Sequence, residues 1–217
     1  MPMADAQAPQ FDQPFRDQLQ ALFRWRRDVR RFRPDAVNDE TLERLIGTAC
    51  LAPSVGLSQP WRFVIVDDPG RRAAVTEVFT ACNREALDAC GPPDAALYAR
   101  LKLAGLNEAP RHLAIFADES EALGRGLGRR TMPETARYSV VGAITTLWLA
   151  ARAEGLGLGW VSILDPGQVS AILDTPNDWT LIGYFCVGYP SAEDDTPELE
   201  RAGWEQRREP EGFIVRR

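Results

Sequence analysis

Histidine is nearly absent from this chain, and its cysteines are few and scattered. His112 is the single histidine, and the four cysteines show no C-x-x-C spacing. A zinc site needs several such ligands close together, so we predict no metal site and reduced, structural thiols. His112 opens the apolar run HLAIFAD, which favours a structural histidine over a catalytic one. A Ser-His-Asp mechanism would depend on that one residue.

Long apolar runs, a basic leader and a nicotinamide fingerprint are also missing. No apolar run reaches the roughly 18 residues that a membrane span needs. The first residues lack a basic stretch followed by an apolar one. We therefore expect a soluble, cytoplasmic protein with no membrane partner. The sequence has no G-x-G-x-x-G motif, which argues against a built-in Rossmann-type nicotinamide site.

The chain has no excess of positive charge. Acidic residues outnumber basic ones by 31 to 25, and the formal net charge is -6. Domains that bind nucleic acid are usually basic, so we expect no nucleic-acid partner. The positive charge is instead local, because the stretch FRWRRDVRRFRP, residues 23 to 34, places six arginines around Asp28.

This arginine cluster has two explanations. It can be a solvated surface whose charges pair with carboxylates elsewhere. It can also bind a phosphate monoester, because guanidinium groups hold phosphate oxygens in bidentate geometry. Asp28 should stay ionised there, since nearby positive charge favours the carboxylate. Asp28 is therefore a candidate base or hydrogen-bond acceptor, but the cluster alone does not identify a ligand.

The rest of the chain alternates between helix and strand patterns, which predicts an α+β fold with a central mixed sheet surrounded by helices. Its 217 residues, 45% of them hydrophobic, suit one domain over residues 13–217, preceded by a flexible N-terminus at 1–12. The patterns predict helices at residues 38–52, 71–90, 94–104, 131–155 and 165–173. They predict strands at residues 62–68, 112–118, 157–164 and 179–190.

Several helix ends carry recognisable signals. Asn38 and Asp165 are predicted N-caps, and Thr131 with Glu134 matches a capping box that would open the longest helix. That helix is apolar on more than one face, which is typical of a helix at the centre of a domain or in a dimer interface.

Three connecting segments are predicted from composition. The pair Pro69-Gly70 marks a turn that closes the first strand. Residues 119–130 carry three glycines and three arginines without periodicity, which indicates a mobile loop. The C-terminal segment GFIVRR, residues 212–217, is apolar enough to pair with a sheet.

Four segments together resemble a known family. RRDVRRF, LAPSVGLSQPWRFVIV, GLGLGWVSILDP and WTLIGYFCVGYP occur in the order and approximate spacing of the nitroreductase-like flavoproteins. The resemblance extends from about residue 13 to the C-terminus. The first and third segments are most similar to the branch of this family that breaks down FMN to 5,6-dimethylbenzimidazole. The resemblance implies a domain-swapped homodimer with FMN at the subunit interface.

In that branch reduced FMN is consumed as a substrate, with O2 as co-substrate, and ribityl carbons leave as erythrose 4-phosphate. By the resemblance, Asp28 and Ser162 are the catalytic residues. The resemblance also implies a set of FMN-binding residues: Arg26, Arg27, Asp28, Val29, Arg30, Ser54, Leu103, Ser162 and Arg208. Reduced FMN could come from NAD(P)H as an indirect reductant, through a separate flavin reductase.

Other interpretations of the same residues stay open. Ser54 could cap the turn after a helix, and Ser162 could be a small hydroxyl in the core. Either Arg207 or Arg208 could replace the arginine that related flavoproteins carry near the C-terminus. Core packing is a better explanation than flavin stacking for Trp61, Trp148 and Trp160. At the level of function, the alternatives are an NAD(P)H-dependent nitroreductase or flavin reductase and a non-catalytic FMN-binding protein.

Overall fold

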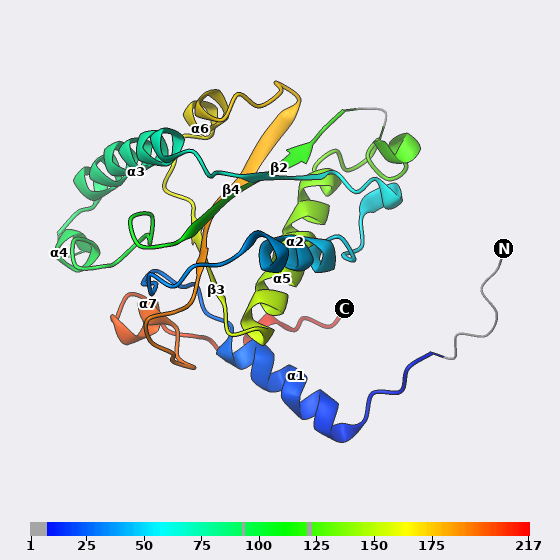
Figure 1. The fold of residues 1–217 in the computed structure, drawn as a ribbon. Coiled ribbons are helices and arrows are strands. Elements are labelled where there is room, and N and C mark those ends of the chain that lie inside the picture. The colour runs from blue at the N-terminus through cyan, green and yellow to red at the C-terminus, as the bar shows by residue number, and fades with distance from the viewer. Residues whose placement is uncertain (1–7, 93, 121–122) are drawn as a thin grey trace.

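A four-stranded sheet lies between two layers of helices in the computed structural model, which describes residues 8–92, 94–120 and 123–217 (Figure 1). The helices are α1 (Gln13–Trp25), α2 (Asp39–Ala49), α3 (Pro69–Ala89), α4 (Asp94–Tyr98), α5 (Thr135–Ala153), α6 (Pro166–Ile172) and α7 (Glu198–Arg201). The strands are β1 (Trp61–Ile65), β2 (Arg111–Asp118), β3 (Gly157–Val161) and β4 (Trp179–Gly188). Short 3-10 turns occupy η1 (Val55–Leu57), η2 (Leu123–Gly126) and η3 (Pro210–Phe213).

The strand order is β1-β2-β4-β3, and the three neighbouring pairs are antiparallel. A parallel element is added at the edge, where Asp28 forms a bridge with Leu158 of β3. The prediction of an α+β fold with a central sheet is therefore confirmed. The bridge also places the arginine cluster at the open edge of β3.

Each face of the sheet has its own core because side chains alternate along the strands. One face carries Leu113, Ile115, Phe185 and Val187, which pack with α2 and α5. The other face carries Ala114, Phe116, Tyr184 and Cys186, which pack with α3 and α6. Helix α5 is apolar and buried along much of its length, as its composition predicts.

The predicted N-caps Asn38 and Asp165 are confirmed. Their side chains accept backbone hydrogen bonds from Thr41 (2.8 Å) and Gln168 (2.7 Å). The capping box at Thr131 is wrong, because α5 begins at Thr135 and has Glu134 as an N-cap without a side-chain bond. The Thr131 hydroxyl instead donates to a carbonyl of the preceding turn.

The predicted turn at Pro69-Gly70 is also wrong, because these residues begin α3. The Asp68 side chain accepts a hydrogen bond from the Arg71 backbone N–H at 2.8 Å, and Pro69 occupies the first helical position. Proline is favoured there because its missing N–H would have had no partner in the helix. Strand β1 accordingly ends at Ile65, earlier than predicted.

The helix predicted over residues 94–104 ends at Tyr98. Tertiary contacts explain the shortening, because the Lys102 carbonyl accepts a hydrogen bond from Arg30 instead of continuing a helix. Gly105 approaches the Phe32 ring so closely that a Cβ would lie 2.5 Å from it. The segment is thus held against the arginine cluster, and this arrangement is not visible in local periodicity.

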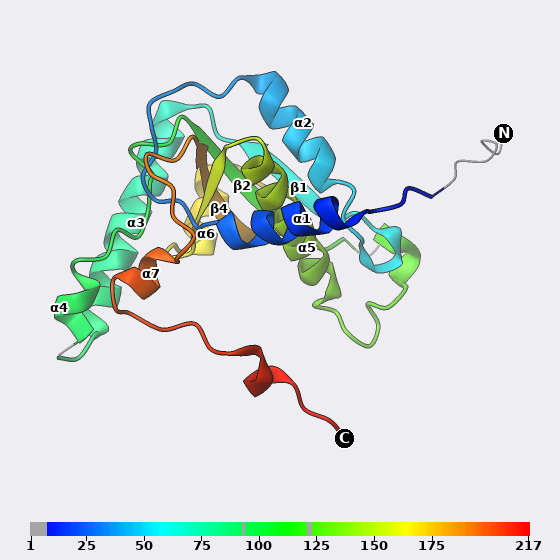
Figure 2. The ribbon, with the colours of Figure 1, turned by 90° about the horizontal axis from the view of Figure 1, so that it is seen from below.

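The two ends of the described chain project from the body (Figure 2). Helix α1 is absent from the sequence predictions and has no buried residue, although it carries Phe15, Leu19, Leu22 and Trp25. Residues 212–217 do not pair with the sheet of their own chain, so the predicted pairing with a sheet is not seen within one chain. One edge of the sheet, β3, is already occupied by the segment around Asp28. Phe213, Ile214 and Val215 remain about two-thirds exposed.

Two predicted mobile segments fall partly outside the described residues. Residues 1–7 of the predicted flexible N-terminus and residues 121–122 of the predicted loop are not among them. Residues 8–12 are exposed and lack regular structure, and the described part of 119–130 contains η2. Their mobility stays a prediction.

His112 has the structural role that the sequence predicts. It is buried, and its Nδ1 lies 2.9 Å from the Tyr184 hydroxyl oxygen. Burial lowers the pKa of His112 to about 4 and raises that of Tyr184 above its usual range. The cysteines are free thiols, and burial raises the pKa of Cys186 to about 12. None of the helices in the described ranges is long and apolar enough to cross a membrane.

Candidate functional site

The site begins where residues 26–30 lie along the edge of β3. The Val29 backbone N–H donates to the Leu158 carbonyl at 2.9 Å. This close approach requires glycines, because a Cβ at Gly159 would lie 2.0 Å from the Val29 carbonyl oxygen. A Cβ at Gly157 would lie 2.5 Å from the Val29 side chain. The glycines of GLGLGW therefore form a surface on which the backbone of the arginine cluster can lie.

Both carboxylate oxygens of Asp28 are held by donors from the protein. Oδ1 accepts from the Trp160 backbone N–H at 2.8 Å, and Oδ2 pairs with Arg30 Nε at 3.0 Å. Arg30 also donates through Nη1 to the Lys102 carbonyl at 3.1 Å, and Leu103 is the next residue along the chain from this contact. The fixed carboxylate remains partly exposed, with 30% of its side-chain surface accessible.

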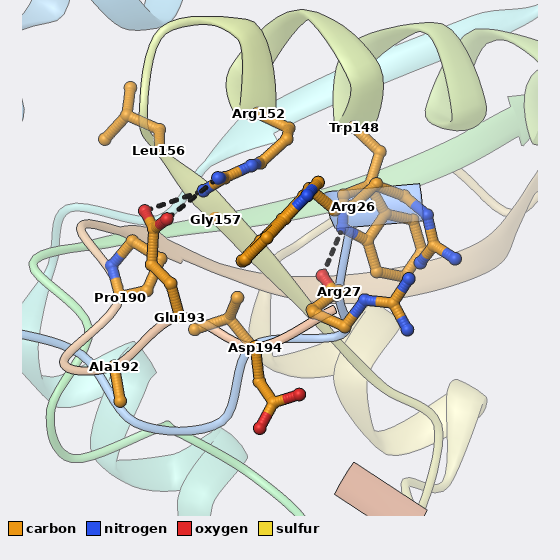
Figure 3. Close-up of a pocket in the computed structure, with 12 residues that line it drawn as sticks. Arg26, Arg27, Trp148, Arg152, Leu156, Gly157, Pro190, Ala192, Glu193 and Asp194 are labelled. Carbon is orange, nitrogen blue, oxygen red and sulfur yellow. Dashed lines mark hydrogen bonds and ion pairs between the residues drawn. The ribbon is translucent and has the colours of Figure 1, made fainter. Parts of the chain in front are cut away.

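Arg26 and Arg27, the two residues before Asp28 in the sequence, contact Trp148 of α5 (Figure 3). The Arg26 guanidinium lies 4.9 Å from the centre of the Trp148 ring, and Trp148 Nε1 donates to the Arg27 carbonyl at 3.0 Å. Burial is the main cause that lowers the pKa of both arginines. Arg27 Nε is buried and has no hydrogen-bond partner among the described residues. A buried donor of this kind would be satisfied by an anion.

A third guanidinium reaches this place from the C-terminal segment. The charge of Arg207 further lowers the pKa of Arg26 and of Arg27. Across residues 8–92, 94–120 and 123–217, no ion pair involves Arg26, Arg27 or Arg207. Three cations without carboxylate partners, together with the unpaired Nε, fit a phosphate monoester.

A cavity of about 320 Å³ opens between this cluster and the segment that follows β4. Its walls combine cations with acids, and two ion pairs cross or flank it: Arg31 with Glu198 at 3.9 Å and Arg201 with Asp194 at 3.3 Å. Residues 27 to 31 form one wall. Asp28 therefore faces a space into which a polar ligand can enter.

Ser162 lies directly after the end of β3. Two residues before it, the backbone N–H of Trp160 donates the hydrogen bond that holds Asp28. The Ser162 side chain is exposed, and no hydrogen bond to it occurs within the described part of the chain. The alternative of a core hydroxyl is therefore wrong, because the strand ends at Val161 instead of continuing to residue 164. An exposed hydroxyl next to the Asp28 segment is available to a ligand.

Ser54 lies apart from the arginine cluster within one chain. Its Oγ accepts from the Gln59 backbone N–H at 3.1 Å, so it does cap the turn after α2. The neighbouring Val55 N–H donates to Ser139 near the start of α5, whereas Arg27 contacts Trp148. Residues 139 and 148 are separated by about 13 Å along the helix axis, at about 1.5 Å per residue.

Sequence reasoning missed the supporting residues of the site. The tryptophans do pack in the core as predicted, but Trp148 and Trp160 also hold Arg27 and Asp28 through N–H groups. The signal that could have found this contact is the pair Gly157 and Gly159, because glycines inside a strand often mark the close approach of another backbone. In the part of the chain that the structure describes, no group of three or more His, Cys, Asp or Glu residues could hold a metal ion.

Residues 23–189 match the model of a protein family that is described as "Nitroreductase family". The chain belongs to the nitroreductase family. Within that family it is 58% identical to a 5,6-dimethylbenzimidazole synthase of Rhodospirillum rubrum over 200 residues, which cover 92% of this chain and 95% of the relative. A 5,6-dimethylbenzimidazole synthase of Rhodobacter capsulatus is 48% identical over 90% of this chain and 95% of its own.

A solved structure shows the same fold. Oxidized iodotyrosine deiodinase bound to FMN and 3-iodo-L-tyrosine matches with a TM-score of 0.72 and 27% identity, over 91% of this chain and 97% of that chain. The predicted nitroreductase-like architecture is confirmed by this match and by the family profile. The predicted relationship to the branch that forms 5,6-dimethylbenzimidazole is confirmed by the two synthases.

Proposed function

We propose that this protein uses O2 to break down reduced FMN to 5,6-dimethylbenzimidazole, the lower ligand of vitamin B12, and releases erythrose 4-phosphate. One observation of the structure carries the proposal. A carboxylate, Asp28, is fixed beside two arginines that have no carboxylate partner among the described residues, and Arg27 Nε is buried and unpaired. The likeness to two 5,6-dimethylbenzimidazole synthases over most of the chain supports it.

The arginines would bind the phosphate of FMN. Arg26, Arg27 and Arg207 supply the positive charge, and Arg27 Nε would gain the partner that it lacks. This assignment replaces the predicted Arg208 with its neighbour. The backbone N–H of Val29 already donates to Leu158 of β3, so Val29 would line the site and would not donate that hydrogen bond to FMN.

Asp28 would accept or relay protons during cleavage of the ring and of the ribityl chain. Its two hydrogen bonds fix its direction, which a general base requires in order to reach the proton that it removes. Ser162 would hydrogen-bond near the reacting ring, and Leu103 would lie beside it. A site that excludes bulk water would protect oxygen chemistry from side reactions.

A second copy of the chain would complete the site. Ser54 lies near the start of α5, apart from the arginines, and it would contact the FMN of the partner's arginine cluster. The exposed apolar side chains of Phe213, Ile214 and Val215 and the unburied face of α1 are surfaces that a homodimer can cover. These observations support the proposal of a homodimer with a shared site.

The fate of FMN tests the proposed function. Purified protein is mixed with reduced FMN under air, and the products are separated by chromatography and identified by mass spectrometry. We expect 5,6-dimethylbenzimidazole and loss of FMN. Intact, reoxidised FMN as the only product would refute the proposal. A free flavin reductase with NAD(P)H can replace the chemical reductant, which tests whether a separate protein can supply reduced FMN.

The family profile favours one further candidate, an NAD(P)H-dependent nitroreductase or flavin reductase that keeps its FMN. Rapid oxidation of NAD(P)H with intact, bound flavin would indicate that activity. Binding of FMN without turnover under any reductant would indicate a flavin-binding protein.

A further inference from the structure

We propose that Arg30 is a positioning residue that holds Asp28 in its working direction, and that it is not a ligand of the FMN phosphate. The inference rests on the proposed function, because it assigns Asp28 the proton-transfer role. It differs from the sequence prediction, in which Arg30 belongs to the arginines that bind the phosphate and ribityl chain.

The donors of Arg30 are already used inside the protein. Its Nε bonds to Asp28 Oδ2 at 3.0 Å, and its Nη1 bonds to the Lys102 carbonyl at 3.1 Å. Only 12% of its side-chain surface is exposed. This differs from Arg27, whose Nε is buried without a partner in the described chain. A guanidinium that is committed to two acceptors has few donors left for phosphate.

The two acceptors of Arg30 belong to segments that are far apart in the sequence. Asp28 is attached to the β3 edge through Trp160, and Lys102 belongs to the segment between α4 and β2. The Lys102 side chain turns away to Glu108, with Nζ and Oε1 2.6 Å apart. Its carbonyl remains available to Arg30. Arg30 therefore connects the catalytic carboxylate to the segment that carries Leu103.

The same cluster contains a matched pair for comparison. Arg33 also pairs with an aspartate two residues away, because its Nε lies 3.2 Å from Asp35 Oδ2. Both of these side chains are about half exposed, at 51% and 52%. Ion pairs at such exposed positions contribute little. The Arg33 pair thus has the same sequence spacing as the Arg30 pair, but it is not buried. It also lacks the bond to Lys102 and does not line the cavity.

The test compares Arg30→Gln, Arg30→Lys, Arg27→Gln and Arg33→Gln. Each variant is measured for its dissociation constant with oxidised FMN, for the kcat and KM with which it forms the benzimidazole product, and for hydrogen exchange of the Trp160 amide. Circular dichroism and thermal unfolding confirm that each variant folds. We expect Arg30→Gln to keep FMN affinity within about threefold and to lower kcat on the order of 100-fold, as misplacement of a catalytic group does.

The other variants separate positioning from phosphate binding. Arg27→Gln should weaken FMN binding about tenfold or more, since a hydrogen bond to a charged group is lost. Arg30→Lys should recover part of kcat, because an ammonium can reach Asp28 but cannot bridge both acceptors as a guanidinium does. The Trp160 amide should exchange about tenfold faster in Arg30→Gln, and Arg33→Gln should match the unchanged protein in every assay.

Two results would overturn the inference. The first is a loss of FMN affinity in Arg30→Gln as large as that in Arg27→Gln. The second is Trp160 exchange in Arg30→Gln equal to that of the unchanged protein. If the unchanged protein forms no 5,6-dimethylbenzimidazole, the proposed function fails, but FMN affinity and amide exchange still decide the role of Arg30.

Discussion

The carboxylate of Asp28 accepts a hydrogen bond from the backbone N–H of Trp160 at 2.8 Å, across a sequence separation of 132 residues. This bond joins the arginine cluster to the edge of the sheet. It explains why one acid stands among six arginines, because a cation at that position could not accept from the strand. The fold thereby fixes a carboxylate next to a group of cations.

Replacing Asp28 with Asn should separate binding from chemistry. Asn keeps an oxygen that can accept from Trp160, but it cannot take up a proton as a carboxylate does. We expect FMN affinity to change little and product formation to fall by about 10² to 10⁴, the range typical of general-base catalysis. Product analysis and FMN titration measure the two effects. Asp35→Asn is the matched control, and equal product from Asp28→Asn would refute the role of Asp28.

Arg207 and Arg208 should differ in their effect on FMN binding. The charge of Arg207 lowers the pKa of both Arg26 and Arg27. Arg207→Gln should therefore weaken FMN binding by about tenfold, as expected for a lost charged contact. Arg208→Gln should leave it nearly unchanged. Fluorescence titration of FMN checks both variants. A larger effect of Arg208→Gln would contradict the assignment of Arg207 to the FMN phosphate.

Gly159→Ala should disrupt the site through the backbone. The new Cβ would lie 2.0 Å from the Val29 carbonyl oxygen, and neither backbone can move without breaking the bonds of Asp28. We expect a loss of about 2 kcal/mol or more in unfolding free energy, together with weaker FMN binding. Urea unfolding and FMN titration are the measurements.

Gly47→Ala provides the control for that substitution. Gly47 lies inside α2, and nothing is within 4 Å of its Cβ position. Alanine should therefore stabilise the protein by up to about 1 kcal/mol through helix propensity. A similar loss of stability at both positions would contradict the close approach described for Gly159.

His112 should make stability depend on pH. Its pKa in the folded protein is about 4, below the value of 6.5 of an exposed histidine. The unfolded chain therefore binds the proton first, and stability falls as the pH drops from about 6.5 to about 4, by about 3 kcal/mol in all. His112→Gln removes this titration. Unfolding curves at pH 7 and 4.5 should show a smaller pH effect in the variant, and an equal effect would contradict the buried neutral histidine.

Local sequence signals predict much of the fold. Helix α2 and strands β2 and β4 follow from N-cap residues and apolar periodicity, which act over a few residues. The errors occur where long-range contacts override local patterns. Residues 99–104 leave the helix, and the Lys102 carbonyl contacts Arg30 instead.

The site follows from sequence only in part. Charge density identifies the arginine cluster, but it does not separate Arg27, which has an unpaired buried donor, from Arg30, whose donors are used. The resemblance to flavoproteins points to Ser54, but it does not reveal that Ser54 lies near Ser139, whereas Arg27 contacts Trp148 further along the same helix. These distinctions depend on distances between segments that are remote in sequence, so neither composition nor periodicity contains them.

The stoichiometry of FMN breakdown tests the central claim most directly. Reduced FMN labelled in its dimethylbenzene ring is incubated with the protein in air and, in parallel, without oxygen. We predict that labelled 5,6-dimethylbenzimidazole appears only in air, one molecule for each FMN lost, with an equal amount of erythrose 4-phosphate. Full recovery of labelled FMN in air would contradict the account and would indicate a protein that binds or reduces flavin without destroying it.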